Sequence, residues 1–189
     1  MSGPGARGDR AWAGAVVMRG RRTVAEATTL GQAEAPYEAG LLALREGPLL
    51  EAAVRALRER LDVLLVDATG RDHPRRAGLA LHLGAVLDVP TVGVTHRPLL
   101  ADGAWPGEAK GETAPLLLDG ERVGAWVRRR QGVRPVAAHP AWRTDTDTAV
   151  RVVLGTAGSH RTPEPLRRAR RLARLERAQT HTRAHPGPS

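Results

Sequence analysis

The sequence contains no cysteine. Disulfides and thiolate metal sites are therefore excluded, and any metal ion must be bound by carboxylate, histidine or backbone oxygen. No stretch approaches the roughly 18 consecutive apolar residues of a membrane span, and residues 1–10 lack the apolar segment of a secretory signal. We therefore expect a cytoplasmic protein that does not bind membranes.

Lysine is almost absent as well, because Lys110 is the one lysine in a chain of net charge +9. A genome biased toward arginine codons explains the choice of arginine but not the excess of positive charge. That excess favours a polyanionic partner, nucleic acid before membrane. Residues 160–185 hold eight arginines against two glutamates. We expect this segment either to add salt-dependent affinity for nucleic acid or to be a solvated helix end.

The length of 189 residues predicts a single domain with room for a hydrophobic core. We expect disorder at 1–10, an α/β domain over 11–179 and a disordered tail at 180–189. Residues 61–94 predict a βαβ unit, and Asp119-Gly120 predicts a hairpin turn. The result is a mixed sheet flanked by helices. Its predicted strands are 13–18, 23–29, 61–66, 91–94, 116–118, 123–127 and 135–138, and its helices 49–59, 74–87, 145–154 and 163–179.

The most informative motif is DATGRDHPRR at 67–76, which follows an apolar strand. A carboxylate at the end of a buried strand, here Asp67, suits a hard cation such as magnesium. Gly70 allows backbone to approach a ligand closely, and the paired Arg75 and Arg76 offer forked donors to phosphate. The motif predicts a place where a metal ion and a phosphate meet.

A second candidate segment is PYEAGLLALREGP at 36–48, which carries the chain's single tyrosine, Tyr37. It also places an acid, Glu46, just before an expected helix. A surface turn leading into that helix explains the segment by itself, because Glu46 would stabilise the helix dipole. Combined with the first motif, the segment supplies a second carboxylate.

Three blocks together resemble endonuclease V, a family of deoxyinosine-directed nucleases with a ribonuclease H-like fold. The blocks are 36–48, 66–84 with 88–94, and RTPEPLRRA at 161–169. The spacing between them fits, and the resemblance covers most of the chain. It implies a metal-dependent endonuclease that cuts a phosphodiester on the 3′ side of inosine in DNA or RNA, as in DNA repair.

The resemblance also implies roles for individual residues in a monomeric enzyme. Glu46 and Asp67 would be the catalytic carboxylates and bind Mg2+ or Mn2+, since a divalent cation offsets their mutual repulsion. His73 matches a position near the phosphate, although a histidine that orients a loop explains it almost as well. The remaining nucleic-acid contacts are a wedge at Tyr37, a base pocket at Gly40, Leu42 and Gly70, and contacts at Arg45, Arg75, Arg76 and His96.

Several positions depart from the family pattern. The family lysine is His96 here, and the wedge Pro-x-Pro is interrupted by Ala39. The family Gly-His reads Ala141-Trp142, so Trp142 takes the histidine position by register, with His139 as a nearby substitute. An aspartate that the family carries on its first strand would precede residue 13, where this chain has no match. Either the start codon is placed too far downstream or the protein is a truncated relative.

These departures leave competing hypotheses. The first is an active endonuclease V-like enzyme, and the second is a catalytically impaired nucleic-acid binder on the same fold. A third, a resolvase- or transposase-like nuclease, would share the carboxylates but not the 36–48 and 66–84 blocks. The choice between DNA and RNA, and between one and two metal ions, stays open.

Overall fold

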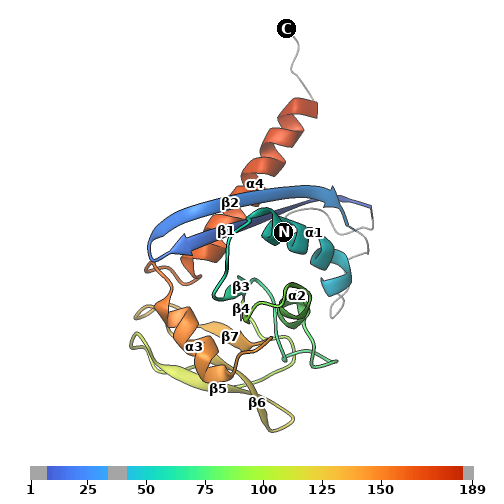
Figure 1. Ribbon diagram of the computed structural model, residues 1–189. Coiled ribbons are helices and arrows are strands. Elements are labelled where there is room, and N and C mark those ends of the chain that lie inside the picture. Colours follow the sequence, from blue (N-terminus) through green and yellow to red (C-terminus); the bar gives the residue numbers. More distant parts are fainter. Residues whose placement is uncertain (1–7, 34–41, 185–189) are drawn as a thin grey trace. The chain divides into compact units, whose positions relative to one another are not determined.

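The computed structural model describes residues 8–33 and 42–184 (Figure 1). The chain forms two compact units, of which the first comprises 1–59 with 167–189 and the second 60–166. The elements in chain order are β1 (Arg10–Arg19), β2 (Arg22–Gln32), α1 (Leu42–Ala56), β3 (Leu64–Val66), α2 (Leu79–Leu87), β4 (Thr91–Thr95), β5 (Thr113–Leu118), β6 (Glu121–Val127), β7 (Val136–Pro140), α3 (Thr146–Gly155) and α4 (Glu164–Ala184).

In the first unit, β1 and β2 form an antiparallel hairpin. Ala11 and Gly31 are paired and therefore share one face. A Cβ on Gly31 would lie 2.8 Å from Leu49 of α1, so α1 covers that face. On the opposite face, a Cβ on Gly14 would collide with the backbone carbonyl of Ala169 in α4. Small residues in the hairpin thus allow a helix to pack closely on each side.

The second unit contains a five-stranded sheet with the order β3-β4-β7-β6-β5. The β3–β4 pair is parallel and the other pairs are antiparallel, so the predicted α/β class with a mixed sheet is confirmed. The predicted hairpin turns at Asp119 and Gly120, which have φ of 54° and 79°, as a type I′ turn requires. Within the described residues β3 pairs with β4 alone, although its apolar sequence predicts a strand in the middle of a sheet.

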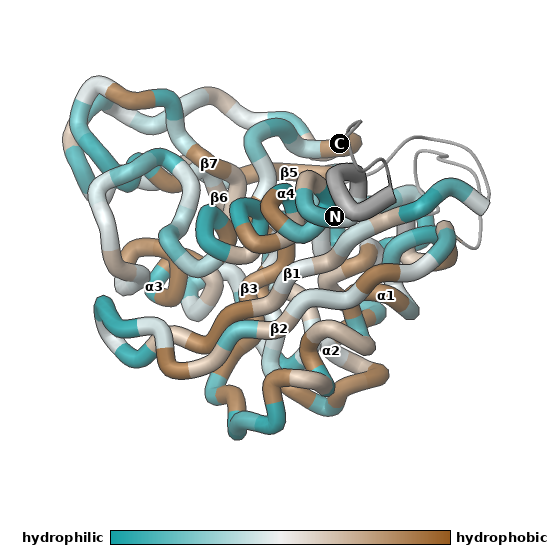
Figure 2. Tube along the Cα trace, turned by 90° about the horizontal axis from the view of Figure 1, so that it is seen from above, coloured by the Kyte–Doolittle hydropathy of each residue, from teal (hydrophilic) through white to brown (hydrophobic). Residues whose placement is uncertain are grey.

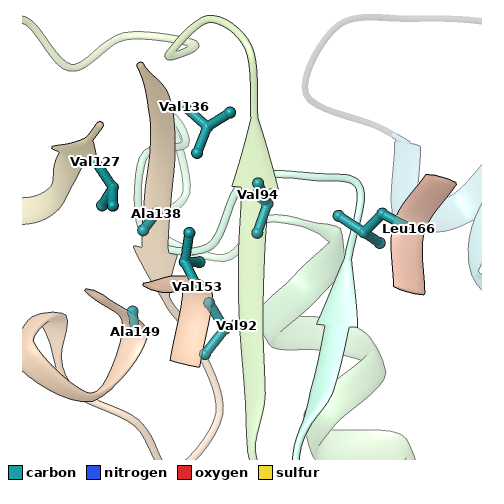
Figure 3. Packing of buried hydrophobic residues seen from close by; sticks show 8 residues of the cluster. All are labelled: Val92, Val94, Val127, Val136, Ala138, Ala149, Val153 and Leu166. Carbon is teal, nitrogen blue, oxygen red and sulfur yellow. The ribbon is translucent and has the colours of Figure 1, made fainter. Parts of the chain in front are cut away.

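Helices cover both faces of this sheet. Val92 and Val94 of β4 belong to an apolar cluster with Val153 of α3 (Figure 3). On the other face of β4, a Cβ on Gly93 would lie 3.3 Å from the Cβ of Ala80, so α2 packs there. The largely hydrophobic colour of α2 in Figure 2 agrees with its position against the sheet.

Helix α1 starts earlier and helix α4 ends later than predicted. α1 runs from Leu42 to Ala56 and continues through Pro48, so Glu46 lies inside the helix and not just before it. α4 continues to Ala184, past residue 179, where a disordered tail was predicted to begin. None of the described helices combines the length and the apolar character that crossing a bilayer requires.

Three arginines of the second unit serve the fold. Arg128 and Arg129 are buried, and each donates to three or more backbone carbonyls, the shorter bonds measuring 2.6–3.0 Å. Arg161 donates to the carbonyl of Pro135 at 2.8 Å. Burial lowers the pKa of Arg129 and of Arg161 from the usual value. These guanidinium groups fasten loops, so part of the positive charge is used internally.

Candidate functional site

The carboxylate of Asp67 stands where the sequence predicts a metal ligand. Asp67 follows β3 directly and is exposed. The chain turns there, since the Ala68 N–H donates to the Val66 carbonyl at 2.9 Å. An exposed carboxylate at the end of an apolar strand suits a hard cation such as Mg2+.

The segment after Asp67 folds back on itself. The helix that was predicted to begin at Pro74 does not begin there. Arg76 has φ of 53°, which lies outside the helical region. The Gly78 N–H donates to the Gly70 carbonyl at 2.7 Å, which closes the segment into a loop. The helix therefore starts only at Leu79.

Gly70 allows a close approach, but the group that approaches is the protein's own backbone. A Cβ at this position would collide with the carbonyl oxygen of Pro140, at the end of β7. Gly78 is similarly crowded by the backbone of Thr69. Both glycines therefore have a packing role in this loop. The predicted base-pocket role of Gly70 stays a prediction.

His73 makes a hydrogen bond within the loop, as the loop-orienting alternative expects, and its predicted contact with the phosphate stays a prediction. It is 6% exposed, and its Nδ1 accepts a hydrogen bond from the Arg75 N–H at 3.2 Å. A neutral ring with Nδ1 as acceptor carries its proton on Nε2. The side chain of Arg75, which is exposed, is thereby placed on the surface of the loop.

Arg76 behaves differently from its neighbour. Its guanidinium lies 2.9 Å from the carboxylate of Asp119 and 3.5 Å from that of Glu121, at the turn between β5 and β6. The 2.9 Å contact is a hydrogen bond, whereas the 3.5 Å contact is an ion pair without hydrogen-bond geometry. Partly exposed pairs contribute about 0–1 kcal/mol, so a phosphate could compete for Arg76.

Asp72 is a structural residue that the sequence analysis did not single out. It is fully buried, and its carboxylate accepts the N–H groups of Leu99, Leu100 and Ala101 at 2.6–2.8 Å. These bonds join the 67–76 motif to the segment that follows β4. Asp72 lies between Arg71 and His73, and nothing in this local sequence predicts that three backbone N–H groups of a distant segment surround it.

His139 lies in the interior of the second unit. It is fully buried in β7, with Nε2 2.9 Å from the hydroxyl of Thr95. Burial lowers its pKa to about 4, and the charge of Asp72 opposes this shift only in part. The imidazole is therefore neutral at pH 7, and the structure gives its side chain no exposed surface for nucleic acid.

His96 and Trp142, which also depart from the family pattern, contact different residues. His96 is exposed, and its Nε2 lies 2.8 Å from the hydroxyl of Thr162. Trp142 packs against Gly84 of α2, and its backbone N–H donates to the Thr91 hydroxyl at 3.0 Å. Their predicted contacts with nucleic acid stay predictions.

The remaining predicted site residues belong to the first unit or lie outside the described residues. Arg45 is 3% exposed and Glu46 is half-buried, both in α1. Leu42 is the first residue of α1, while Tyr37 and Gly40 fall outside the described ranges.

The donors available for a metal ion are carboxylate oxygens, which suit Mg2+ or Mn2+ in kind. Across residues 8–33 and 42–184, however, no three side chains of the His, Asp and Glu types gather as a metal site. Asp67 and Glu46 also belong to different units. A cation shared by these two residues therefore stays a prediction.

These features define an α/β protein with an acidic strand end beside a basic loop. Comparison with known proteins identifies the family, because the sequence profile of Endonuclease V matches residues 4–171. Endonuclease V of Streptomyces avermitilis is 42% identical over 151 residues, which cover 80% of this chain and 66% of that protein. The chain belongs to the Endonuclease V family.

Solved structures agree with this assignment. The catalytic domain of human Endonuclease V matches with a TM-score of 0.83 at 34% identity, and the match covers 90% of this chain and 77% of that one. Endonuclease V of Ciona intestinalis, solved in complex with a DNA that contains inosine, shares the fold with a TM-score of 0.71 at 18% identity, over 90% of this chain and 85% of that one. The present chain spans just under two thirds of the length of the Streptomyces relative.

Proposed function

We propose that this chain is a metal-dependent endonuclease that hydrolyses a phosphodiester on the 3′ side of inosine in DNA or RNA. The observation that carries the proposal is the exposed carboxylate of Asp67 at the end of β3, within a motif that also presents Arg75 at the surface. Membership of the family supports it, as does the inosine-containing DNA bound by the Ciona protein.

The residues of the chain divide the work by their chemistry. Asp67 and Glu46 would hold Mg2+ or Mn2+, which when bound supplies Lewis acidity and a more acidic water. Arg75 would contact a phosphate with its forked donors, and the Nε2–H of His73 is a further donor in the same loop. Tyr37, Gly40 and Leu42 would contact the base.

Cleavage of a labelled inosine oligonucleotide tests the proposal directly. We expect cutting of single- or double-stranded inosine substrate with Mg2+ or Mn2+, no cutting with EDTA, and no cutting of a matched adenine oligonucleotide. Products one position beyond the inosine on its 3′ side would support the predicted chemistry. A folded protein that cuts neither substrate with either metal would overturn it.

A second candidate function is nucleic-acid binding without cleavage. The observation that favours it is the lack of a group of three metal-binding side chains within the described residues. Binding of the inosine oligonucleotide without cutting would select this candidate. The cytoplasmic location and the monomeric state stay predictions.

A further inference from the structure

Several segments of the second unit meet at the edge of the sheet where β4 ends. β4 is parallel to β3 and antiparallel to β7, so β3 and β4 end at this edge and β7 begins there. Figure 3 shows β7, which carries Val136 and Ala138, running opposite to β4. Asp67 follows β3 directly and therefore lies at the same edge.

Arg161 joins two of the segments at this edge. It donates to the carbonyl of Pro135 from Nη2 at 2.8 Å and from Nε at 3.1 Å, and Nη2 also donates to the carbonyl of His96 at 3.3 Å. Pro135 follows Arg134 in the chain, and His96 precedes Arg97. The fold thereby brings together three arginines from separate segments, of which Arg97 and Arg134 are exposed.

We call Arg97, Arg134 and Arg161 the arginine cluster. Burial and then the charge of Arg134 lower the pKa of Arg161, as expected for two guanidinium groups held near each other. Among the residues that the structure describes, no salt bridge joins a member of the cluster to a carboxylate. An anion bound between these groups would offset their repulsion.

We propose that the arginine cluster binds phosphate groups of a nucleic-acid strand, at the sheet edge where Asp67 lies. The proposal rests on the proposed function for the class of partner. Guanidinium groups suit phosphate because their donors form a fork. Arg161 fastens the two backbone segments, and the exposed Arg97 and Arg134 supply the contacts with the strand.

Salt dependence of binding tests the cluster. Affinity for a labelled single strand without inosine is measured in EDTA by fluorescence anisotropy, over a range of salt concentrations, for the parent and for R97Q/R134Q. Each lost phosphate contact lowers the slope of log affinity against log salt by about 0.7 on single strands. We expect the double variant to lose about 1.4 from the slope.

The control is R60Q/R151Q, which removes the same charge from two exposed arginines of the second unit. Arg60 precedes β3, at the end of that strand away from Asp67, and Arg151 is in α3. We expect the control to stay close to the parent slope, and R97K/R134K, which keeps the charge, to retain it.

Equal slopes for R97Q/R134Q and the parent would overturn the inference, as would an equal loss in the control. Cutting of the inosine oligonucleotide by the parent is scored separately. Failure of the proposed function and failure of this inference therefore give different results.

Discussion

At the scale of single residues, the role of Asp67 is the most direct test of the proposed chemistry. In D67N the negative charge of the proposed metal ligand is lost while the side chain keeps its shape. Even partners of metal ligands cost 10- to 100-fold when changed, so we expect cutting to fall by more than about 100-fold and inosine binding to change little. Cleavage rates measure the loss of cutting, and fluorescence anisotropy measures binding of the inosine oligonucleotide.

The matched control is D62N, which removes an exposed acid shortly before β3. It should cut like the parent. A strong loss of binding in D67N, or a similar loss of cutting in D62N, would show that Asp67 is structural.

His139 predicts how stability depends on pH. Its pKa is about 4 in the folded protein and about 6.5 in the unfolded chain. Between these values only the unfolded chain takes up the proton, so this residue's contribution is complete above pH 6.5 and falls by about 3 kcal/mol as the pH drops to 4. Urea unfolding at several pH values measures the loss.

We expect H139N to show a flatter pH dependence than the parent between pH 6.5 and 4. H82N, which changes an exposed histidine of α2, is the control and should keep the parent's dependence. If H139N keeps it too, another group causes the acid sensitivity.

Residue type alone does not predict where a side chain lies in the fold. Arg75 and Arg76 are neighbours of the same type, yet Arg75 is on the surface and Arg76 reaches Asp119. The difference arises from the positive φ of Arg76 and from a partner in a distant hairpin. Neither can be seen in the local sequence.

At the scale of elements, the loop after β4 depends on one buried acid. In D72N the side-chain NH2 group would face one of the three backbone N–H groups that now donate to the carboxylate. Leaving a buried N–H without its acceptor costs about 1–3 kcal/mol, so we expect D72N to lower the free energy of unfolding by about 2–3 kcal/mol. Urea denaturation measures it.

D102N is the control, because Asp102 is exposed and its carboxylate accepts the N–H of the adjacent Gly103, at 2.8 Å. It should change the stability by less than about 0.5 kcal/mol. Equal stability of D72N and the parent would show that the loop is held by its other contacts.

Elements defined by local chemistry were predicted well, and those defined by distant partners were not. The hairpin between β5 and β6 follows from Asp119 and Gly120 alone, and α3 begins at the predicted acid because Asp145 accepts the Thr148 N–H at 2.6 Å. The start of α2 was misplaced because Gly78 bonds to Gly70 instead of continuing a helix.

At the scale of the whole molecule, burial predicts an order of local stability. β4 and β7 are central in their sheet and almost wholly buried, whereas every second residue of β2 is exposed. Amides of the central strands should therefore exchange with solvent only by global unfolding, and those of β2 faster. Hydrogen exchange read by NMR tests this, and equal protection of β2 and β4 would contradict it.

The family could be identified from the sequence because the resemblance lies in three contiguous blocks. The blocks carry Glu46, Asp67 and the basic loop, each recognisable from residue type and order. What the sequence could not supply is the packing around them, such as the amides that surround Asp72 or the burial of His139. Those depend on segments far apart in the chain.

The buried arginines of the second unit restrict how this protein can diverge. Lysine could keep the charge at many exposed positions among its 28 arginines. Arg128 and Arg129 cannot follow, because an ammonium group lacks the planar fork that spans several carbonyls at once. A descendant rich in lysine would retain arginine at those two positions.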